Sequence, residues 1–185
     1  TAIEDWLRDP YTIYAKFILK LAPLDAVDMP LSAADRGSAI HDALGDFTKL
    51  YPATLPDNPA SVLRDIGQAH FAPLMERPEA RALWWPRFRR IAAWFAEWET
   101  DRRINVVKID AEERGEIGIP LDDGRKFMLS ARADRIEHRT DRTYAILDYK
   151  TGTPPSSKQV RLGLSPQLTL ESAILRGGGF KSIPA

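Results

Sequence analysis

The stretch SARADRIEHRTDRTYAILDYK, residues 130–150, decides the fold because it reads as two strands joined by a tight turn. Alternating and β-branched residues lie on both sides of Thr140-Asp141-Arg142, a pattern typical of an antiparallel hairpin. With Asp141 near the apex, Asp134 and Asp148 are equally far from the turn, so they become cross-strand partners. Directly opposed side chains have Cβ atoms about 5 Å apart, and like charges at that distance are destabilising.

A divalent cation would offset the repulsion between Asp134 and Asp148. Hard oxygen ligands at about 2.1 Å suit Mg²⁺. Lys150 lies two residues after Asp148, and the period of two along a strand directs both side chains to one sheet face. A carboxylate pair with an adjacent ammonium group can hold a metal and stabilise the charge that builds on a phosphate. The hairpin therefore predicts metal-dependent phosphodiester hydrolysis.

Working outward, the chain around this hairpin predicts an antiparallel meander preceded by helices. Strands are expected over 106–109, 116–121, 126–137 and 144–149, with Asp122-Asp123-Gly124 as a turn. Before Asn105 the apolar spacing is helical, with helix starts at Asp9-Pro10 and at Ser32 with Asp35. A proline-rich loop over 51–60 separates two of these helices. A last helix is expected with Ser165 as its cap, Pro166 at its first position and glycines 177–179 as its end.

The helix expected over 79–103 carries a broad aromatic and aliphatic face. Its members recur at intervals of three and four: Trp84, Phe88, Ile91, Phe95 and Trp98. Aromatic side chains with interleaved arginines can stack on single-stranded bases, but the helical period favours core packing. Arg87, Arg89 and Arg90 are then expected to be solvated.

Composition narrows the class of protein. The 185 residues suffice for one domain, and the absence of cysteine excludes disulfides and thiolate chemistry. The 26 basic and 26 acidic side chains cancel, although basic groups gather toward the C-terminal end. No apolar run spans a bilayer and no secretory signal is evident, so no membrane partner and a cytoplasmic location are expected. The abrupt start indicates a fragment of a larger chain.

Four segments together resemble a known family. AILDYKTG (145–152), preceded by SARADRIE (130–137), resembles the PD-(D/E)XK nuclease superfamily, and most closely its RecB-type exonuclease branch. RGSAIHDALGDF (36–47) resembles the helix that contributes a histidine, DPYTIYAKFILKL (9–21) the opening segment, and SPQLTLESAIL (165–175) the glutamine motif. The ordered set is most similar to the C-terminal nuclease domain of AddB-type double-strand break repair proteins.

The resemblance implies a role for each matching residue. Asp134 and Asp148 would be metal ligands, and Lys150 the catalytic lysine. The Tyr149 backbone carbonyl and His41 would complete the ligand set, and Gln167 would orient DNA or groups of the site. Glu113 or Glu112 would match the strand glutamate, with Glu113 taken as the additional site residue.

Two features depart from the family pattern. Glu171 stands where the glutamine motif usually continues to a tyrosine, and the chain lacks the cysteines with which AddB-type relatives often hold an iron–sulfur cluster. No iron–sulfur cluster is therefore expected in this chain.

The sequence as a whole predicts an α/β restriction-endonuclease-like domain over 1–185, with a small mixed sheet flanked by helices. Residues 1–103 would form a helical subdomain, and 104–185 the sheet, the catalytic hairpin and the following helix. The expected function is Mg²⁺-dependent (or Mn²⁺-dependent) exonucleolytic cleavage of DNA in double-strand break repair or recombination, within a helicase–nuclease complex. Two alternatives stay open: a catalytically silent nuclease fold that binds DNA or braces a complex, and a hydrolase of RNA or another phosphodiester.

Overall fold

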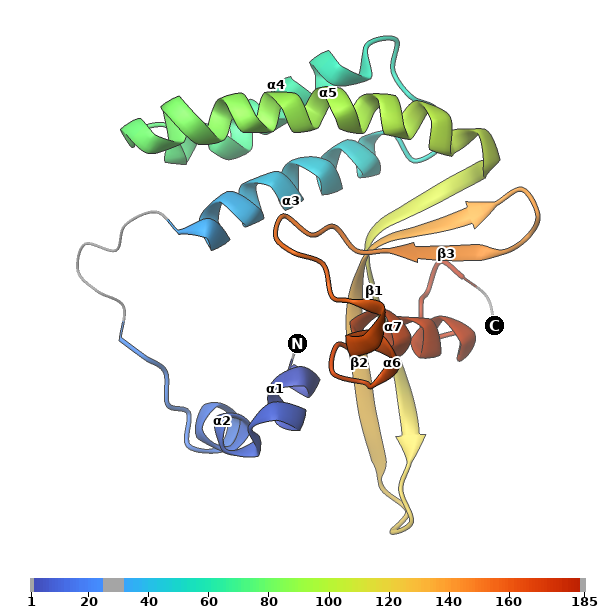
Figure 1. Ribbon diagram of the computed structural model, residues 1–185. Coiled ribbons are helices and arrows are strands. Elements are labelled where there is room, and N and C mark those ends of the chain that lie inside the picture. Colours follow the sequence, from blue (N-terminus) through green and yellow to red (C-terminus); the bar gives the residue numbers. More distant parts are fainter. Residues whose placement is uncertain (1, 25–31, 184–185) are drawn as a thin grey trace.

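The computed structural model describes residues 2–24 and 32–183 (Figure 1). Ten main elements follow one another in the described ranges: α1 (Ala2–Arg8), α2 (Pro10–Ile13), α3 (Ala33–Leu50), α4 (Pro59–Phe71), α5 (Trp85–Arg102), β1 (Val106–Pro120), β2 (Lys126–Arg139), β3 (Tyr144–Leu147), α6 (Ser157–Arg161) and α7 (Gln167–Arg176). Short π-helical turns cover Tyr14–Ile18 and Ala80–Trp84, and 3-10 turns cover Ala72–Leu74 and Arg103–Asn105. The restriction-endonuclease-like α/β class predicted from the sequence is confirmed.

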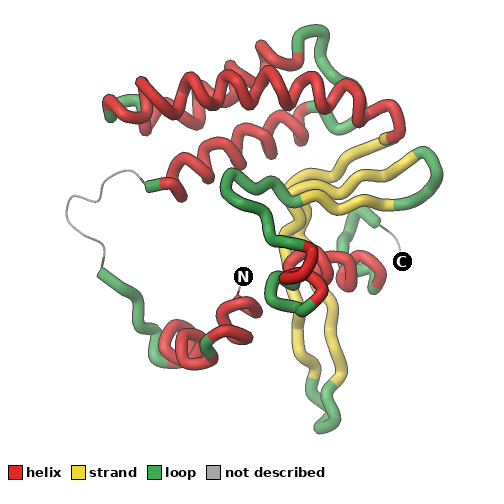
Figure 2. Tube along the Cα trace, viewed as in Figure 1, coloured by secondary structure: helices red, strands yellow, loops and turns green. Residues whose placement is uncertain are grey.

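Helices α3, α4 and α5 form one layer at one end of the sheet (Figures 1 and 2). The predicted start of α3 is confirmed as a capping box, in which the Ser32 hydroxyl and the Asp35 carboxylate satisfy each other's backbone N–H groups. The aromatic face of α5 packs inward as predicted, because Phe88 and Phe95 are buried in a core shared with α3 and α4. The core of this layer consists of Ala39, Ile40, Ala43, Leu44, Phe47, Leu63, Phe71, Phe88, Ala92 and Phe95.

The three strands form an antiparallel sheet in the order β1-β2-β3. Arg135 pairs with Leu147 and Ile136 with Ile146, so the second hairpin has the predicted register centred on Asp141. The small mixed sheet expected from the sequence is not found: every strand pair within the described ranges is antiparallel. A parallel neighbour would need a crossover connection, whereas the chain after Leu147 leaves the sheet for α6 and α7.

The first hairpin is longer than predicted. The two strands expected over 106–109 and 116–121 form the single strand β1, and Figure 2 shows β1 and β2 extending away from the helical layer toward their turn. Besides a register shift between Val106 and Lys108, pairing lapses between Ala111↔Arg135 and Glu113↔Ala133, where Glu112 has a left-handed backbone with φ of 56°. For a residue other than glycine this conformation is strained, and such strain collects at functional sites.

A second core lies between the sheet and α7, and it contains Leu129, Ala133, Ile136, Ile174, Phe180 and Ile183. Helix α1 belongs with this core, because Ile3 packs against it and the Trp6 ring lies 6.4 Å from that of Phe127. The helical subdomain expected over 1–103 is therefore divided. Figure 1 shows α1 and α2 apart from α3–α5. Ile3 and Trp6 of α1 instead contact apolar side chains of the second core and of the first hairpin.

The predicted start of the last helix differs by one residue. Pro166 is the N-cap of α7 and Gln167 its first residue, while the Ser165 hydroxyl donates to Glu4 Oε1 at 3.1 Å instead of capping. The predicted end is confirmed, with Gly177 as the C-cap. Across the described part of the chain, no helix has the length and apolar character needed to cross a membrane.

Gly67 tests the packing of α4 on α5. A Cβ atom at this position would lie 1.9 Å from Cε1 of the buried Phe88. Gly67→Ala should lower the free energy of unfolding by about 1–3 kcal/mol through overpacking, although alanine ordinarily stabilises a helix relative to glycine by about 1 kcal/mol. Urea denaturation measures the change. Gln68→Ala, on the exposed side of α4, is the control, and a Gly67→Ala variant more stable than the wild type would contradict this packing.

Candidate active site

His41, Asp134 and Tyr149 meet where α3 crosses the sheet. The His41 Nε2 atom lies 2.9 Å from Asp134 Oδ2 and 3.2 Å from the Tyr149 carbonyl oxygen. Both partners only accept hydrogen bonds, so Nε2 carries a proton and donates to them. The backbone N–H of Tyr149 donates to the same Asp134 oxygen at 2.8 Å. Three groups from different parts of the chain thus converge on one small space.

The charges of this group reinforce one another. The hydrogen bond to Asp134 raises the pKa of His41 above its ordinary value, although partial burial opposes the rise. Burial of Asp134 acts to raise the pKa of its carboxyl group, but hydrogen bonds from His41 and Tyr149 N–H outweigh that effect and the pKa is lowered. Asp134 is therefore an anion. Its side chain is 8 % exposed and is held in place by these hydrogen bonds.

Glu112 adds a second carboxylate from β1. Its Oε1 lies 3.7 Å from His41 Nδ1, and its Oε2 lies 3.0 Å from Arg132 Nε. Gly45, on α3, makes room for this side chain, because a Cβ there would lie 3.3 Å from Glu112 Cγ and Oε1. Within the described residues, His41, Glu112 and Asp134 offer ligand atoms that all lie within 4.8 Å of one another.

Asp148 and Lys150 lie beside this group, bound to each other and to Gln167. Lys150 Nζ is 2.6 Å from Asp148 Oδ2 and 3.1 Å from Gln167 Oε1. The Gln167 amide donates to Asp148 Oδ1 at 2.7 Å. Asp148 is only 8 % exposed but Lys150 is 42 % exposed, so the ammonium group remains open to a ligand from solution.

Glu171, one turn after Gln167 on α7, positions the glutamine. Its Oε1 accepts from the Gln167 amide at 3.2 Å, and its Oε2 makes no hydrogen bond to any described residue. Burial raises the pKa of Glu171 to about 7, and the negative charges of Asp148 and Asp134 add to the rise. The carboxyl group that replaces the family's tyrosine is thus a buried acid that holds Gln167 toward Asp148 and Lys150.

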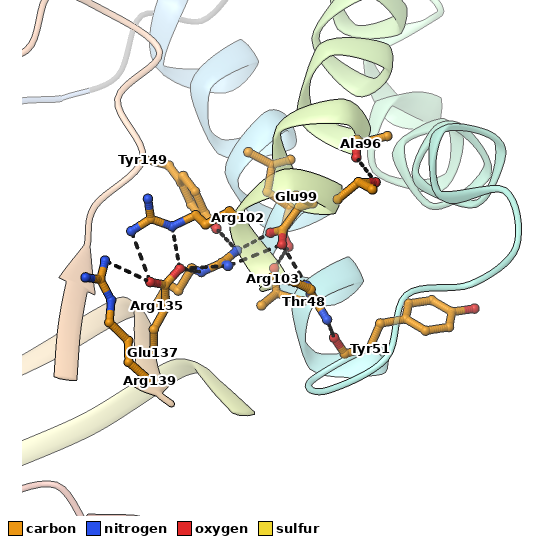
Figure 3. A network of polar contacts seen from close by, with 12 residues as sticks. Thr48, Tyr51, Ala96, Glu99, Arg102, Arg103, Arg135, Glu137, Arg139 and Tyr149 are labelled. Carbon is orange, nitrogen blue, oxygen red and sulfur yellow. Dashed lines mark hydrogen bonds and ion pairs between the residues drawn. The ribbon is translucent and has the colours of Figure 1, made fainter. Parts of the chain in front are cut away.

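A buried ionic network fixes the helical layer against the sheet behind the site (Figure 3). Arg135 of β2 is fully buried between Glu99 of α5, which it contacts through both terminal nitrogens, and Glu137, 2.8 Å away. Glu137 also receives two hydrogen bonds from Arg102. Arg135 Nη1 donates to the Tyr149 hydroxyl at 3.1 Å. The residue next to Asp134 in sequence thereby ties Tyr149 to the helices.

The group at His41 has the chemistry of a site for a divalent cation. The proton on His41 Nε2 faces Asp134 Oδ2 and the Tyr149 carbonyl, so a cation replacing that proton would meet an imidazole nitrogen and two hard oxygen atoms. The two oxygen donors suit Mg²⁺ and Mn²⁺, whereas an imidazole nitrogen is a ligand typical of transition metals. Glu112 supplies a further carboxylate oxygen, and Asp148, which lies outside the group, is held by Lys150 and Gln167.

The structure brings together every residue assigned from the sequence except Glu113. His41, Asp134 and the Tyr149 carbonyl form one cluster, and Asp148, Lys150 and Gln167 form an adjacent one. Glu112, the alternative to Glu113, is the strand glutamate that reaches His41. Counting from the turn would have selected it, because Glu112 and Asp134 are equally far from Asp123, just as Asp134 and Asp148 are from Asp141. The role of Glu171 carries no such signal, since it depends on the packing of α7.

An Asp-x-Lys pair beside a partly buried histidine and two carboxylates, on an α/β restriction-endonuclease-like fold, is the arrangement of a nuclease-type site. The chain belongs to the PD-(D/E)XK nuclease superfamily, whose family model matches residues 1–182. It is 34% identical over 180 residues to an uncharacterized protein of Rickettsia bellii and 32% identical over 184 residues to one of Rickettsia conorii. These matches cover 97% of the chain but 22% of each relative, so the chain spans about a fifth of the length of these curated relatives.

The raised pKa of Glu171 predicts a pH dependence of stability. Because the folded-state pKa of about 7 lies above the ordinary value of 4.5 for this carboxyl group, the folded protein binds the proton more tightly than the unfolded chain does. The resulting stability is fully present below pH 4.5 and is lost as the pH rises through about 7. Glu171→Gln lacks this loss. The free energy of unfolding of the variant minus that of the wild type should therefore rise by up to about 3 kcal/mol between pH 4 and pH 8.

Urea denaturation with EDTA at a series of pH values measures this difference. Glu97→Gln, an exposed position on α5, is the control and should follow the wild type. Parallel curves for Glu171→Gln and the wild type would show that Glu171 is ionised in the folded protein at neutral pH.

Proposed function

We propose that this chain is a Mg²⁺-dependent deoxyribonuclease that hydrolyses phosphodiester bonds at the His41–Asp134 group. The observation that carries the proposal is the convergence of His41 Nε2, Asp134 Oδ2 and the Tyr149 carbonyl within about hydrogen-bond distance, beside the Asp148–Lys150 pair. His41, Asp134, Asp148 and the Tyr149 carbonyl would hold the cation, with Glu112 as the further carboxylate. The bound cation would supply a nucleophile at neutral pH and neutralise charge on the phosphate.

The side chains around the cation site have separate tasks. Lys150 is half-exposed and carries a positive charge toward solution, so it can bind the scissile phosphate and stabilise the charge that develops there. Gln167 holds the Lys150 ammonium group and the Asp148 carboxylate in a fixed relation through its amide. Glu171 in turn holds Gln167. The site is thereby organised before substrate binds, which reduces the cost of reorganisation in the transition state.

We further propose an exonucleolytic role in double-strand break repair or recombination, as in the RecB and AddB branches that the four segments resemble. The chain spans about a fifth of its curated relatives, which is consistent with a nuclease domain joined to other domains. Equal numbers of acidic and basic side chains favour weak, salt-sensitive DNA binding by the chain itself. A helicase partner would then supply much of the DNA affinity and the processivity.

Removing Asp134 should abolish metal binding. Asp134→Asn should weaken Mg²⁺ and Mn²⁺ binding by at least about 100-fold, because even residues that only support metal ligands contribute about 10- to 100-fold. Isothermal titration calorimetry at low salt measures the affinity, and Asp42→Asn, the exposed neighbour of His41 on α3, is the charge-matched control. Unchanged affinity in Asp134→Asn would refute the proposed ligand set.

Lys150→Met should separate catalysis from metal binding. Cleavage of labelled single-stranded DNA in Mg²⁺ should fall by about 100- to 1,000-fold, the effect of removing one group that stabilises developing charge, while metal affinity stays near that of the wild type. Lys158→Met, an exposed lysine on α6, is the control. Wild-type rates in Lys150→Met would exclude Lys150 from the reaction, and a wild-type chain that binds metal but cleaves no DNA would favour the silent scaffold.

A further inference from the structure

One face of α5 is directed toward the proposed active site. Arg87, Ile91, Trp94 and Trp98 follow one another at intervals of four, three and four residues, which places them on one side of the helix. All four line a cleft of about 610 Å³ between α5, α3 and the end of β3. Trp94 was not part of the aromatic stripe predicted to face the core, and it is 60 % exposed.

The cleft runs directly into the site. Its wall includes Asp148, Tyr149 and Lys150 in addition to the α5 residues, and apolar side chains from α3 and α7 complete it. A volume of this size is in the range of about 300–1,000 Å³ that accommodates small organic ligands. A planar group lodged against α5 would therefore lie next to the Lys150 ammonium group.

The aromatic wall is a stack with one open end. Trp94 lies on Trp98, with ring centroids 6.1 Å apart and planes inclined by 21°. The guanidinium groups of Arg102 and Arg135 lie 5.0 and 5.3 Å from the Trp98 ring, so Trp98 is fixed by the buried network. Trp94 is held by this stack while most of its surface remains in solvent, which is the arrangement of a rigid platform for a further ring.

The charges at the cleft favour an anionic ligand. Arg36, Arg87 and Lys150 line it, against Asp148 as the one acidic residue among the described lining residues. Arg87 makes no ion pair or side-chain hydrogen bond within residues 2–24 and 32–183 and is exposed, so its charge is available. A ring-binding wall edged by cations matches a nucleotide, which joins a planar base to a phosphate.

We propose that this cleft is a nucleobase subsite, in which Trp94 stacks on one unstacked base of single-stranded DNA while Arg87 and Lys150 contact the flanking phosphates. The proposal rests on the proposed function and specifies its substrate: a base within a duplex has both faces covered by its neighbours and cannot stack on Trp94. Single strands and frayed ends therefore enter the site, and intact duplex does not.

Binding without cleavage tests the subsite. The 185-residue chain is titrated in EDTA at low salt against fluorescein-labelled oligothymidylate, and anisotropy gives the dissociation constant. Trp94→Ala should weaken binding about 5- to 160-fold, because stacking of one base on an aromatic side chain contributes about 1–3 kcal/mol. Trp94→Phe should recover most of the affinity. Trp6→Ala, which removes a tryptophan of similar exposure on α1, should bind as the wild type does.

An oligonucleotide of the same length that lacks bases distinguishes a loss of base stacking from a general loss of protein structure in the variant. The wild type should bind it more weakly than oligothymidylate, and Trp94→Ala should cause little further loss. Arg87→Gln should lower the slope of log affinity against log salt by about 0.7, the value for one phosphate of a single strand, whereas Arg89→Gln, which lines a different hollow on α5, should not. Equal losses of affinity for both strands in Trp94→Ala, or no loss for oligothymidylate, would overturn the proposal.

The subsite and the proposed reaction fail separately. If Trp94→Ala binds oligothymidylate as the wild type does and the wild type cleaves DNA with Mg²⁺, the subsite proposal is refuted and the nuclease proposal stands. If Trp94→Ala loses base-dependent binding but the wild type cleaves no DNA, the subsite proposal is supported and the nuclease proposal is refuted.

Discussion

The buried charge of Arg135 is the constraint on which the rest of the structure depends. A guanidinium group with no exposed surface is tolerated only when it is fully paired, and here Glu99 and Glu137, equally inaccessible, supply the partners. Burial alone would lower the pKa of Arg135, but the hydrogen bonds and charge of Glu99 outweigh it and the pKa is raised. The network thus fixes α5 against β2, and through its hydrogen bond to Tyr149 it fixes the segment after β3 as well.

This constraint passes directly to the candidate site. Tyr149 presents its N–H to Asp134 and its carbonyl to His41, while its hydroxyl is bound to Arg135. Side chains alternate between the two faces of β2, so the neighbours Arg135 and Asp134 point to opposite faces. Arg135 is neutralised in the interior, and Asp134 faces the candidate metal site. The proposed nucleobase subsite uses the same support, since Trp98 lies over Arg135 and carries Trp94. The paired guanidinium group of Arg135 therefore orders both the candidate site and the aromatic wall of the cleft.

The features that the sequence made predictable are those set by local rules. Ser32 and Asp35 predicted the start of α3. The turn at Asp141 predicted the register that brings Asp134 opposite the end of β3. His41 and Gln167 came from the resemblance to the nuclease superfamily, and in the structure they contact Asp134 and Asp148 respectively. The buried aromatic stripe of α5 followed from its period. In each case neighbours within a few residues, or a symmetric count about a turn, carry the information.

The features that were not predictable arise from packing between distant segments. The left-handed backbone of Glu112, whose side chain packs beside Gly45 of α3, is a conformation that no propensity scale favours. Helix α1 covers the hairpin and not α3, a choice between two apolar surfaces that period alone cannot make. Trp94 and Trp98 lie on the same side of α5, but it is Trp98 that Arg102 and Arg135 cover. The buried role of Glu171 likewise depends on where α7 docks on the sheet.

The origin of the proposed metal-binding group in three separate segments of the chain affects when the group can form. His41 and Tyr149 are 108 residues apart in the chain, so no short segment contains the group, and α3 alone offers a solitary imidazole. Closing so long a loop is a slow and costly step that native contacts compensate only once they have formed. During synthesis the helical layer can assemble first, while the proposed cation site stays incomplete until β2 and β3 have been synthesised and have docked. The nuclease centre proposed above therefore cannot form before Tyr149 has been synthesised and has docked against His41.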